Sequence, residues 1–229
     1  HPKAKKGHFK WAYLSSMVCV LCCSMHFLCV AAQSAVNLFI PAYLSDTFDL
    51  SLGTSGALLS LRAVATLTGI MLLRKRVGGM KDRWRLISYG GCLRGLALLL
   101  ILPINLLPQN LVFPIISFFF SGFQSCLLNL SLMITIQEEA SLVTGDPKEV
   151  VAGPAASIFV TCMNAGRLAG MMFTGSLIDS VGYQRTFSGF GCIILAFSIA
   201  CYFLIKIYRS QPKKERDLET PFLEANGKQ

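Results

Sequence analysis

The chain has 229 residues, of which 53% are hydrophobic and 14% are charged, with a mean hydropathy of +0.56 and a net charge of +9. Soluble domains carry about 25% charged residues, so this charge fraction is too low to cover a water-facing surface. Disordered chains combine high net charge with low hydrophobicity, which this chain does not have. The composition therefore excludes both classes and indicates an integral membrane protein.

Six segments of the sequence are long and apolar enough to cross a membrane, which takes about 20 mainly apolar residues. They are 11–45, 50–73, 86–107, 111–137, 151–178 and 186–205. The first is longer than the bilayer core, and we expect its polar end to protrude or break near Pro41. Breakers lie between the segments, among them Gly145-Asp146-Pro147 and Gly182. The sequence thus predicts an all-α polytopic bundle of six transmembrane helices over residues 11–207.

The basic residues indicate how the bundle is oriented. Seventeen of the 21 Lys and Arg residues fall on one side, in 1–10, in 74–85, at Lys148 and from 206 onward. Arg185 alone falls on the other side, and three arginines lie inside the spans. Since basic loops stay in the cytoplasm, we expect both termini there and no nucleic-acid partner. Residues 1–10 form a basic segment and 208–229 a tail that we expect to be disordered. The sequence does not separate a plasma-membrane from a vacuolar location.

The nine cysteines all lie inside the apolar segments. We interpret them as small packing residues, because no nearby histidine and carboxylate complete a metal site. We expect no metal and no cofactor. The chain also lacks the phosphate-binding loop of ATP-driven pumps.

One motif is shared with an enzyme class. Gly53-Thr54-Ser55-Gly56 matches the sequence around the nucleophile of rhomboid-type intramembrane proteases. Such a serine needs a base, which that family takes from a later helix. The three histidines of this chain all precede Ser55, so the sequence favours a helix start here. An intramembrane serine hydrolase remains the disfavoured alternative.

Three arginines lie inside the spans, where each costs about 2.5–3.5 kcal/mol or more to insert. Arg62 and Arg167 are near the centres of their segments, and a functional role is favoured over structural hydrogen bonding. For Arg94, nine residues from the basic loop, a structural role is favoured, with snorkelling toward the loop as one way to reach water. No acidic residue lies deep in a span. We expect the partners to be helix carbonyls, a substrate anion or carboxylates outside this chain.

Side-chain amides accompany these arginines on the same segments. They are Gln33, Asn37, Gln124, Asn129 and Asn164. Asn164 and Arg167 are three residues apart and so share a helix face. Gly166 and Gly170 have a spacing that permits either close helix approach or a cavity.

Two loop motifs carry a family resemblance. Residues 78–85 contain the pair Asp82-Arg83 in a degraded form of a G-x-x-x-D-R-x-G-R-R motif. Residues 175–185 contain a second segment that is similar to this motif and includes Asp179. With six helices and cytoplasmic ends, the chain resembles one half of a major facilitator superfamily transporter. Residues 41–45 and 51–63 are similar to the opening of the C-terminal half in fungal members.

The resemblance implies two inverted three-helix repeats and secondary transport of a small solute by alternating access. Arg62, Arg167 and the amides would then line the translocation path, with Asp82, Arg83 and Asp179 in gating or structural loops. We expect the arginines to stabilise negative charge, so an anionic substrate is favoured. Because the chain begins at His1, we also expect a missing N-terminal six-helix half as partner. A non-transporting membrane scaffold is a further alternative.

Overall fold

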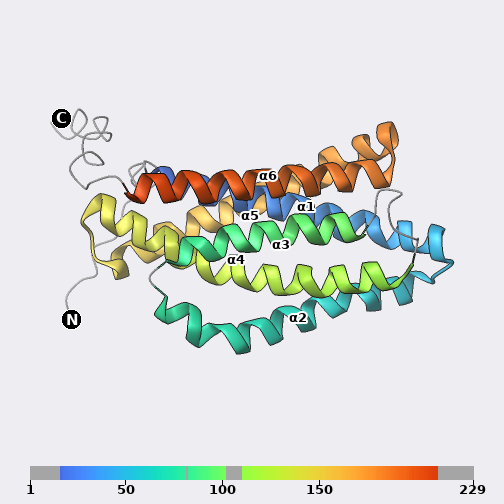
Figure 1. Ribbon diagram of the computed structural model, residues 1–229, viewed down its shortest axis with the longest axis horizontal. Helices are drawn as coiled ribbons and strands as arrows, with labels where there is room; N and C mark the ends of the chain where they lie inside the picture. The colour runs from blue at the N-terminus through green and yellow to red at the C-terminus, as the bar shows by residue number, and fades with distance from the viewer. Residues whose placement is uncertain (1–15, 81, 102–109, 211–229) are drawn as a thin grey trace.

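The computed structural model is a bundle of six long helices (Figure 1). It describes residues 16–80, 82–101 and 110–210, without the side chains of 52, 74–76, 78 and 79. The helices are α1 (Met17–Phe48), α2 (Leu52–Gly79), α3 (Arg83–Ile101), α4 (Val112–Thr144), α5 (Lys148–Val181) and α6 (Tyr183–Ser210). The predicted basic segment 1–10 lies outside the described residues, and so does the tail from 211 on. The all-helical polytopic fold is confirmed.

Most of the helices are longer than the apolar segments that predicted them. The expected break near Pro41 is wrong, because α1 continues through this proline to Phe48. A proline removes one helical hydrogen bond but does not have to end a helix that its neighbours hold in place. Among the described residues, five helices are long and apolar enough to cross a membrane, and α5 does not reach that level. Its polar residues, among them Asn164 and Arg167, lower its hydropathy.

The connections between helices follow local sequence signals. Ser51 caps the start of α2, where its hydroxyl accepts a hydrogen bond from the Thr54 amide at 3.1 Å. Gly145 and Gly182 follow α4 and α5 with φ angles of 69° and 83°, which a side chain would disfavour. The predicted breaks at these glycines are therefore confirmed, and Ser55 lies at the start of a helix.

Small residues allow three helix pairs to approach closely. On α5, a Cβ added to Gly166 would lie 2.7 Å from the Phe27 carbonyl of α1, and one at Gly170 would collide with the Ala31 carbonyl. Gly122 of α4 similarly meets the α2 backbone, and Gly95 of α3 faces α6. Of the two roles open to the glycines at 166 and 170, the structure shows close helix approach.

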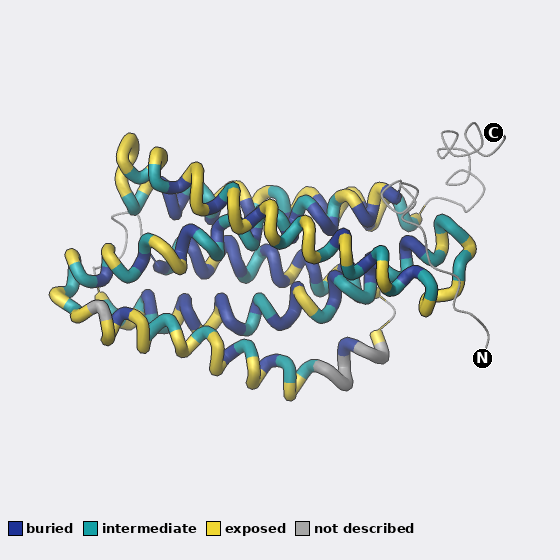
Figure 2. Tube along the Cα trace, turned by 180° about the vertical axis from the view of Figure 1, so that it is seen from behind, coloured by how far each residue is buried: buried dark blue, intermediate teal, exposed yellow. Residues whose placement is uncertain are grey.

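Burial differs strongly between the helices. α1 contacts each of the other five helices and supplies much of the apolar core. α2 lies at one edge of the bundle, with exposed and half-buried residues along its outer side (Figure 2). Large apolar side chains are exposed on α2 and on α5, for example Leu67, Met71 and Met172. These two helices therefore offer apolar surface that the described residues do not cover.

Candidate functional site

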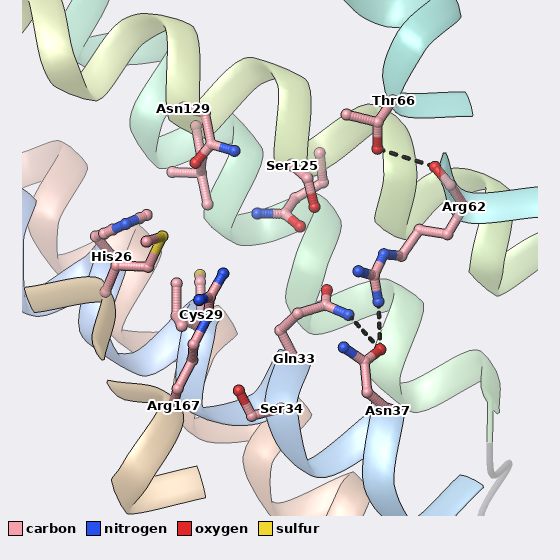
Figure 3. Close-up of a pocket in the computed structure, with 14 residues that line it drawn as sticks. His26, Cys29, Gln33, Ser34, Asn37, Arg62, Thr66, Ser125, Asn129 and Arg167 are labelled. Carbon is pink, nitrogen blue, oxygen red and sulfur yellow. Dashed lines mark hydrogen bonds between the residues drawn. The ribbon is translucent and has the colours of Figure 1, made fainter. Parts of the chain in front are cut away.

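A polar cavity of about 240 Å³ lies between α1, α2, α4 and α5 (Figure 3). Six of the seven residues that the sequence singled out for a translocation path line it: Gln33, Asn37, Arg62, Gln124, Asn129 and Arg167. Asn164, the seventh, is exposed and is not among the lining residues. The four helices thus bring together polar groups that are up to 134 positions apart in the chain.

Arg62 is held by a side-chain amide of the cavity. Its Nη1 donates to Oδ1 of Asn37 at 2.5 Å, and Nε2 of Gln33 donates to the same oxygen at 3.0 Å. The expectation that the partner would be a carbonyl, a substrate anion or an outside carboxylate missed this contact. An amide oxygen is neutral, so the contact satisfies a donor and leaves the positive charge of Arg62 uncompensated.

The same network reaches the core of the bundle. Ser121 of α4 donates to Oε1 of Gln33 at 3.5 Å and accepts a hydrogen bond from Nη1 of Arg94 on α3. Arg94 is 1% exposed, and its Nε and Nη2 have no partner among the described residues. Snorkelling of Arg94 toward the loop is therefore wrong, because its guanidinium bonds inside the bundle instead.

Close backbone packing fixes both cavity arginines. The Thr66 hydroxyl donates to the carbonyls of Arg62 at 2.9 Å and Gly122 at 3.0 Å, which ties α2 to α4 beside Arg62. Gly166 and Gly170 seat α5 on α1, with Arg167 between them in sequence. Figure 3 shows the two guanidinium groups entering the cavity from different helices. The small residues that set the helix spacing thus also place the charges.

His26 lines the cavity, although no role was expected for it from the sequence. It is 2% exposed, and neither imidazole nitrogen has a hydrogen-bond partner among the described residues. Its ring stacks on Phe159 of α5, with 4.6 Å between the ring centroids. A histidine inside an apolar span was the available signal. Ser34, Thr66 and Ser125 also line the cavity and were missed, because serine and threonine are common in membrane helices.

The charge in the cavity has one sign. Arg62 and Arg167 are the charged residues that line it, and no Asp or Glu belongs to its described lining. Within the described part of the chain, Arg167 makes no hydrogen bond or ion pair. Two guanidinium groups that lack a carboxylate can grip an oxyanion with paired hydrogen bonds. This arrangement suits the binding of a small anion.

A second polar cluster lies at one end of the bundle. Glu138 of α4 pairs with Arg83 at the start of α3 and, at 3.3 Å, with Lys148 at the start of α5. Glu139 accepts from Arg209 of α6 at 2.5 Å and from Ser16 before α1 at 3.0 Å. The two adjacent carboxylates thus join the ends of five helices. The sequence predicted Arg83 at this place but not its acidic partners.

The other two loop-motif residues are less constrained. Asp82 forms an exposed ion pair with Arg85 at 3.1 Å, with both side chains about half exposed. Asp179 is exposed near the end of α5. Neither geometry tests a gating role.

The remaining candidates give no sign of chemistry. The cysteines are unpaired, and six of the nine are buried. No group of three or more possible metal ligands occurs among the residues that the structure describes. The hydroxyl of Ser55 is fully buried and has no hydrogen-bond partner in the described chain, so no base is in place to activate it.

Comparison with known proteins agrees with the fold. A search of curated proteins finds no match to this chain. The family model for the Major Facilitator Superfamily matches residues 22–227, which span all six helices except the first turn of α1. The chain is therefore an integral, multi-pass membrane protein and belongs to the Major Facilitator Superfamily.

Proposed function

We propose that this chain is one half of a carrier that moves a small solute across a membrane by alternating access and that the cavity is part of the solute-binding site. Family membership supports membrane transport in general. The observation that carries the finer proposal is the meeting of six polar residues from four helices in one cavity.

The charge of the cavity supports an anionic solute. Arg62 and Arg167 both enter it, and its described lining holds no carboxylate to neutralise them. Holding such charges inside a membrane without a partner is costly, whereas a bound carboxylate or phosphate offsets that cost. A cationic solute would be repelled by the same two groups.

In this proposal the chain is one half of the carrier. Asn37, Asn129 and Arg167 are exposed, so the cavity is open on a side that the described residues do not cover. A second six-helix unit facing this side would close it, and the exposed apolar residues of α2 and α5 would pack against that unit. A membrane scaffold without transport would not require polar residues to converge there.

The packing also supports two inverted three-helix repeats. α1 packs along α5, and α4 packs along α2. In such a repeat α1 corresponds to α4 and α2 corresponds to α5. The contact between α1 and α5 then corresponds to the contact between α4 and α2. Glu138 and Glu139 bring the predicted cytoplasmic ends of the helices to one end of the bundle. We propose that this end faces the cytoplasm, in either a plasma or a vacuolar membrane.

Solute uptake tests this proposal. Vesicles from cells that express the transporter are given radiolabelled acetate, succinate, inorganic phosphate or glucose, with vesicles from untransfected cells as background. We expect saturable uptake of at least one of the anions and background uptake of glucose. The matched control is Leu142→Ala, which alters an exposed α4 residue outside the cavity and should leave uptake unchanged. Saturable glucose uptake without any anion uptake would contradict the anionic class, and no uptake of any solute would contradict transport of these small solutes.

A further inference from the structure

An unbroken hydrogen-bonded chain joins Arg94 in the core to Arg62 in the cavity. It runs from Arg94 of α3 through Ser121 of α4 to Gln33 and Asn37 of α1, and ends at Arg62 of α2. Four helices therefore contribute to one network. Its two ends are both guanidinium groups, which can donate hydrogen bonds but cannot accept them.

Arg62 fixes the direction of these bonds, because a guanidinium can only donate. The Asn37 atom that it meets must therefore be Oδ1. The Gln33 atom that meets the same oxygen must be a donor, so Nε2 of Gln33 faces Asn37 and Oε1 faces Ser121. Ser121 accepts from Arg94 and gives its single hydroxyl proton to this Oε1. Both amide orientations follow from the chemistry of the network.

This direction decides what the cavity presents to a solute. The oxygen of Asn37 is occupied by two donors, so its NH₂ group is the part that remains for a ligand. Figure 3 shows that nitrogen beside the shared oxygen, on the side of Ser34. Together with the remaining N–H groups of Arg62 and those of Arg167, it forms a wall of donors. A carboxylate or phosphate oxygen can accept from such a wall, whereas a solute rich in donors cannot.

We propose that Arg94 is a positioning residue: through Ser121 and Gln33 it holds the NH₂ group of Asn37 toward the cavity, which selects an oxyanion. This inference rests on the proposed function and says which groups select the substrate class. It also gives a reason for a guanidinium at 1% exposure, since burying a charge for packing alone would be costly. Arg94 does not line the cavity, so its effect passes through its neighbours.

Two serines of α4 provide a matched test. Ser121 and Ser117 lie one helical turn apart, both are at most 1% exposed, and both hydrogen-bond to α3, Ser117 donating to the Ala97 carbonyl at 2.6 Å. Only Ser121 belongs to the chain that leads to the cavity. Ser121→Ala and Ser117→Ala should therefore cost similar thermal stability while differing in their effect on anion binding.

The dissociation constants of acetate and of inorganic phosphate are measured by calorimetry on the purified protein in detergent, at constant ionic strength. We expect the wild type to bind at least one of them, which also tells a carboxylate site from a phosphate site. Ser121→Ala should raise that constant by roughly threefold to tenfold, the equivalent of one net hydrogen bond, and Ser117→Ala should leave it unchanged. Asn37→Asp, which turns the donor into an acceptor, should abolish binding. If Ser121→Ala does not fold, Gln33→Leu breaks the same chain at a half-buried position and should give the same loss.

Equal anion affinity in the two serine variants would overturn the role of Arg94. Absence of binding by the wild type to both anions would overturn the selection of an oxyanion. Neither result depends on transport. If uptake requires Arg62 while Ser121→Ala keeps wild-type affinity, the positioning role fails and the proposed transport function stands. If anion affinity follows the expected pattern but no solute is moved, the positioning role stands and the transport function fails.

Discussion

Arg62 and Asn37 form the contact on which the cavity depends, with Nη1 of one 2.5 Å from Oδ1 of the other. A carboxylate at position 37 would have neutralised the arginine and closed the site to anions. The amide instead orients the guanidinium and leaves its charge in place. The cavity is thus preorganised for negative charge without being filled by a partner from its own described residues.

Replacing either cavity arginine should impair uptake. Arg62→Ala and Arg167→Ala each remove a charge-assisted grip on the anion, so we expect roughly tenfold to hundredfold weaker apparent affinity in an uptake assay. Lys at either site keeps the charge but loses the planar fork of donors, and should restore uptake only in part. Arg185→Ala, outside the cavity on the α6 start, is the control. Normal uptake by both Ala variants would show that the arginines are structural.

The sequence predicted the fold better than the site. Six apolar segments and breakers such as Gly145 and Gly182 predict the helices, because length and hydropathy govern membrane insertion. Arginines and amides inside such segments indicated six of the fourteen residues that line the cavity, since polar groups there are costly. Their partners could not be predicted, because the contact between Arg62 and Asn37 depends on how α1 and α2 rotate about their axes.

Gly170 should be essential for seating α5 on α1. A Cβ at this position would collide with the Ala31 carbonyl, and backbone cannot move aside as a flexible side chain can. We expect Gly170→Ala to lower the free energy of unfolding by about 1–3 kcal/mol and to weaken uptake, because Arg167 moves with the helix. Thermal unfolding in detergent measures the first effect.

Gly153→Ala is the matched control on the same helix. Gly153 is exposed, and nothing lies within 4 Å of an added Cβ. Because Gly153 precedes Pro154, whose ring crowds a preceding side chain in a helix, alanine should change the free energy of unfolding by less than about 1 kcal/mol. A Gly170→Ala variant as stable as Gly153→Ala would show that α1 and α5 are not closely packed.

The ion pair between Glu139 and Arg209 should matter more than surface pairs. Glu139 is 7% exposed and also accepts from Ser16, so its removal leaves buried donors without an acceptor. We expect Glu139→Gln to destabilise the bundle by roughly 1–3 kcal/mol. The exposed pair Asp82–Arg85 is the control, and its removal should cost about 1 kcal/mol or less. A double-mutant cycle with Arg209→Gln measures the coupling directly. A coupling no larger than that of Asp82 and Arg85 would refute a special role for Glu139.

The proposed orientation can be tested by labelling. The basic segments predict that the loop after α1 faces away from the cytoplasm and that the loop after α2 faces it. Cysteines introduced at Thr47 and Gln109 should react with an impermeant thiol reagent from outside intact cells, if the protein is in the plasma membrane, whereas one at Gly78 should react only after permeabilisation. For a vacuolar location the same contrast applies across the vacuolar membrane. Labelling of Gly78 from the outer side alone would reverse the topology.

His26 was missed because a lone histidine in an apolar span is as typical of a packing residue as of a ligand-binding residue. Its position in the cavity predicts opposite effects on stability and on function. His26→Phe keeps a ring to stack on Phe159 and removes two buried nitrogens that have no partner among the described residues, so the melting temperature should rise, by the equivalent of about 1 kcal/mol. Solute uptake should fall, because those nitrogens are the polar groups that this part of the wall offers to a ligand.

The control for His26→Phe is Cys29→Ala. This change removes a buried side chain from the same wall of α1 without removing a strong hydrogen-bonding group. It should lower stability through a small cavity and leave uptake unchanged. A His26→Phe variant that is more stable and transports normally would mean that the unpartnered imidazole has no ligand. A variant that loses stability and uptake together would mean that the ring is held by contacts beyond the stack on Phe159, and that its role is packing.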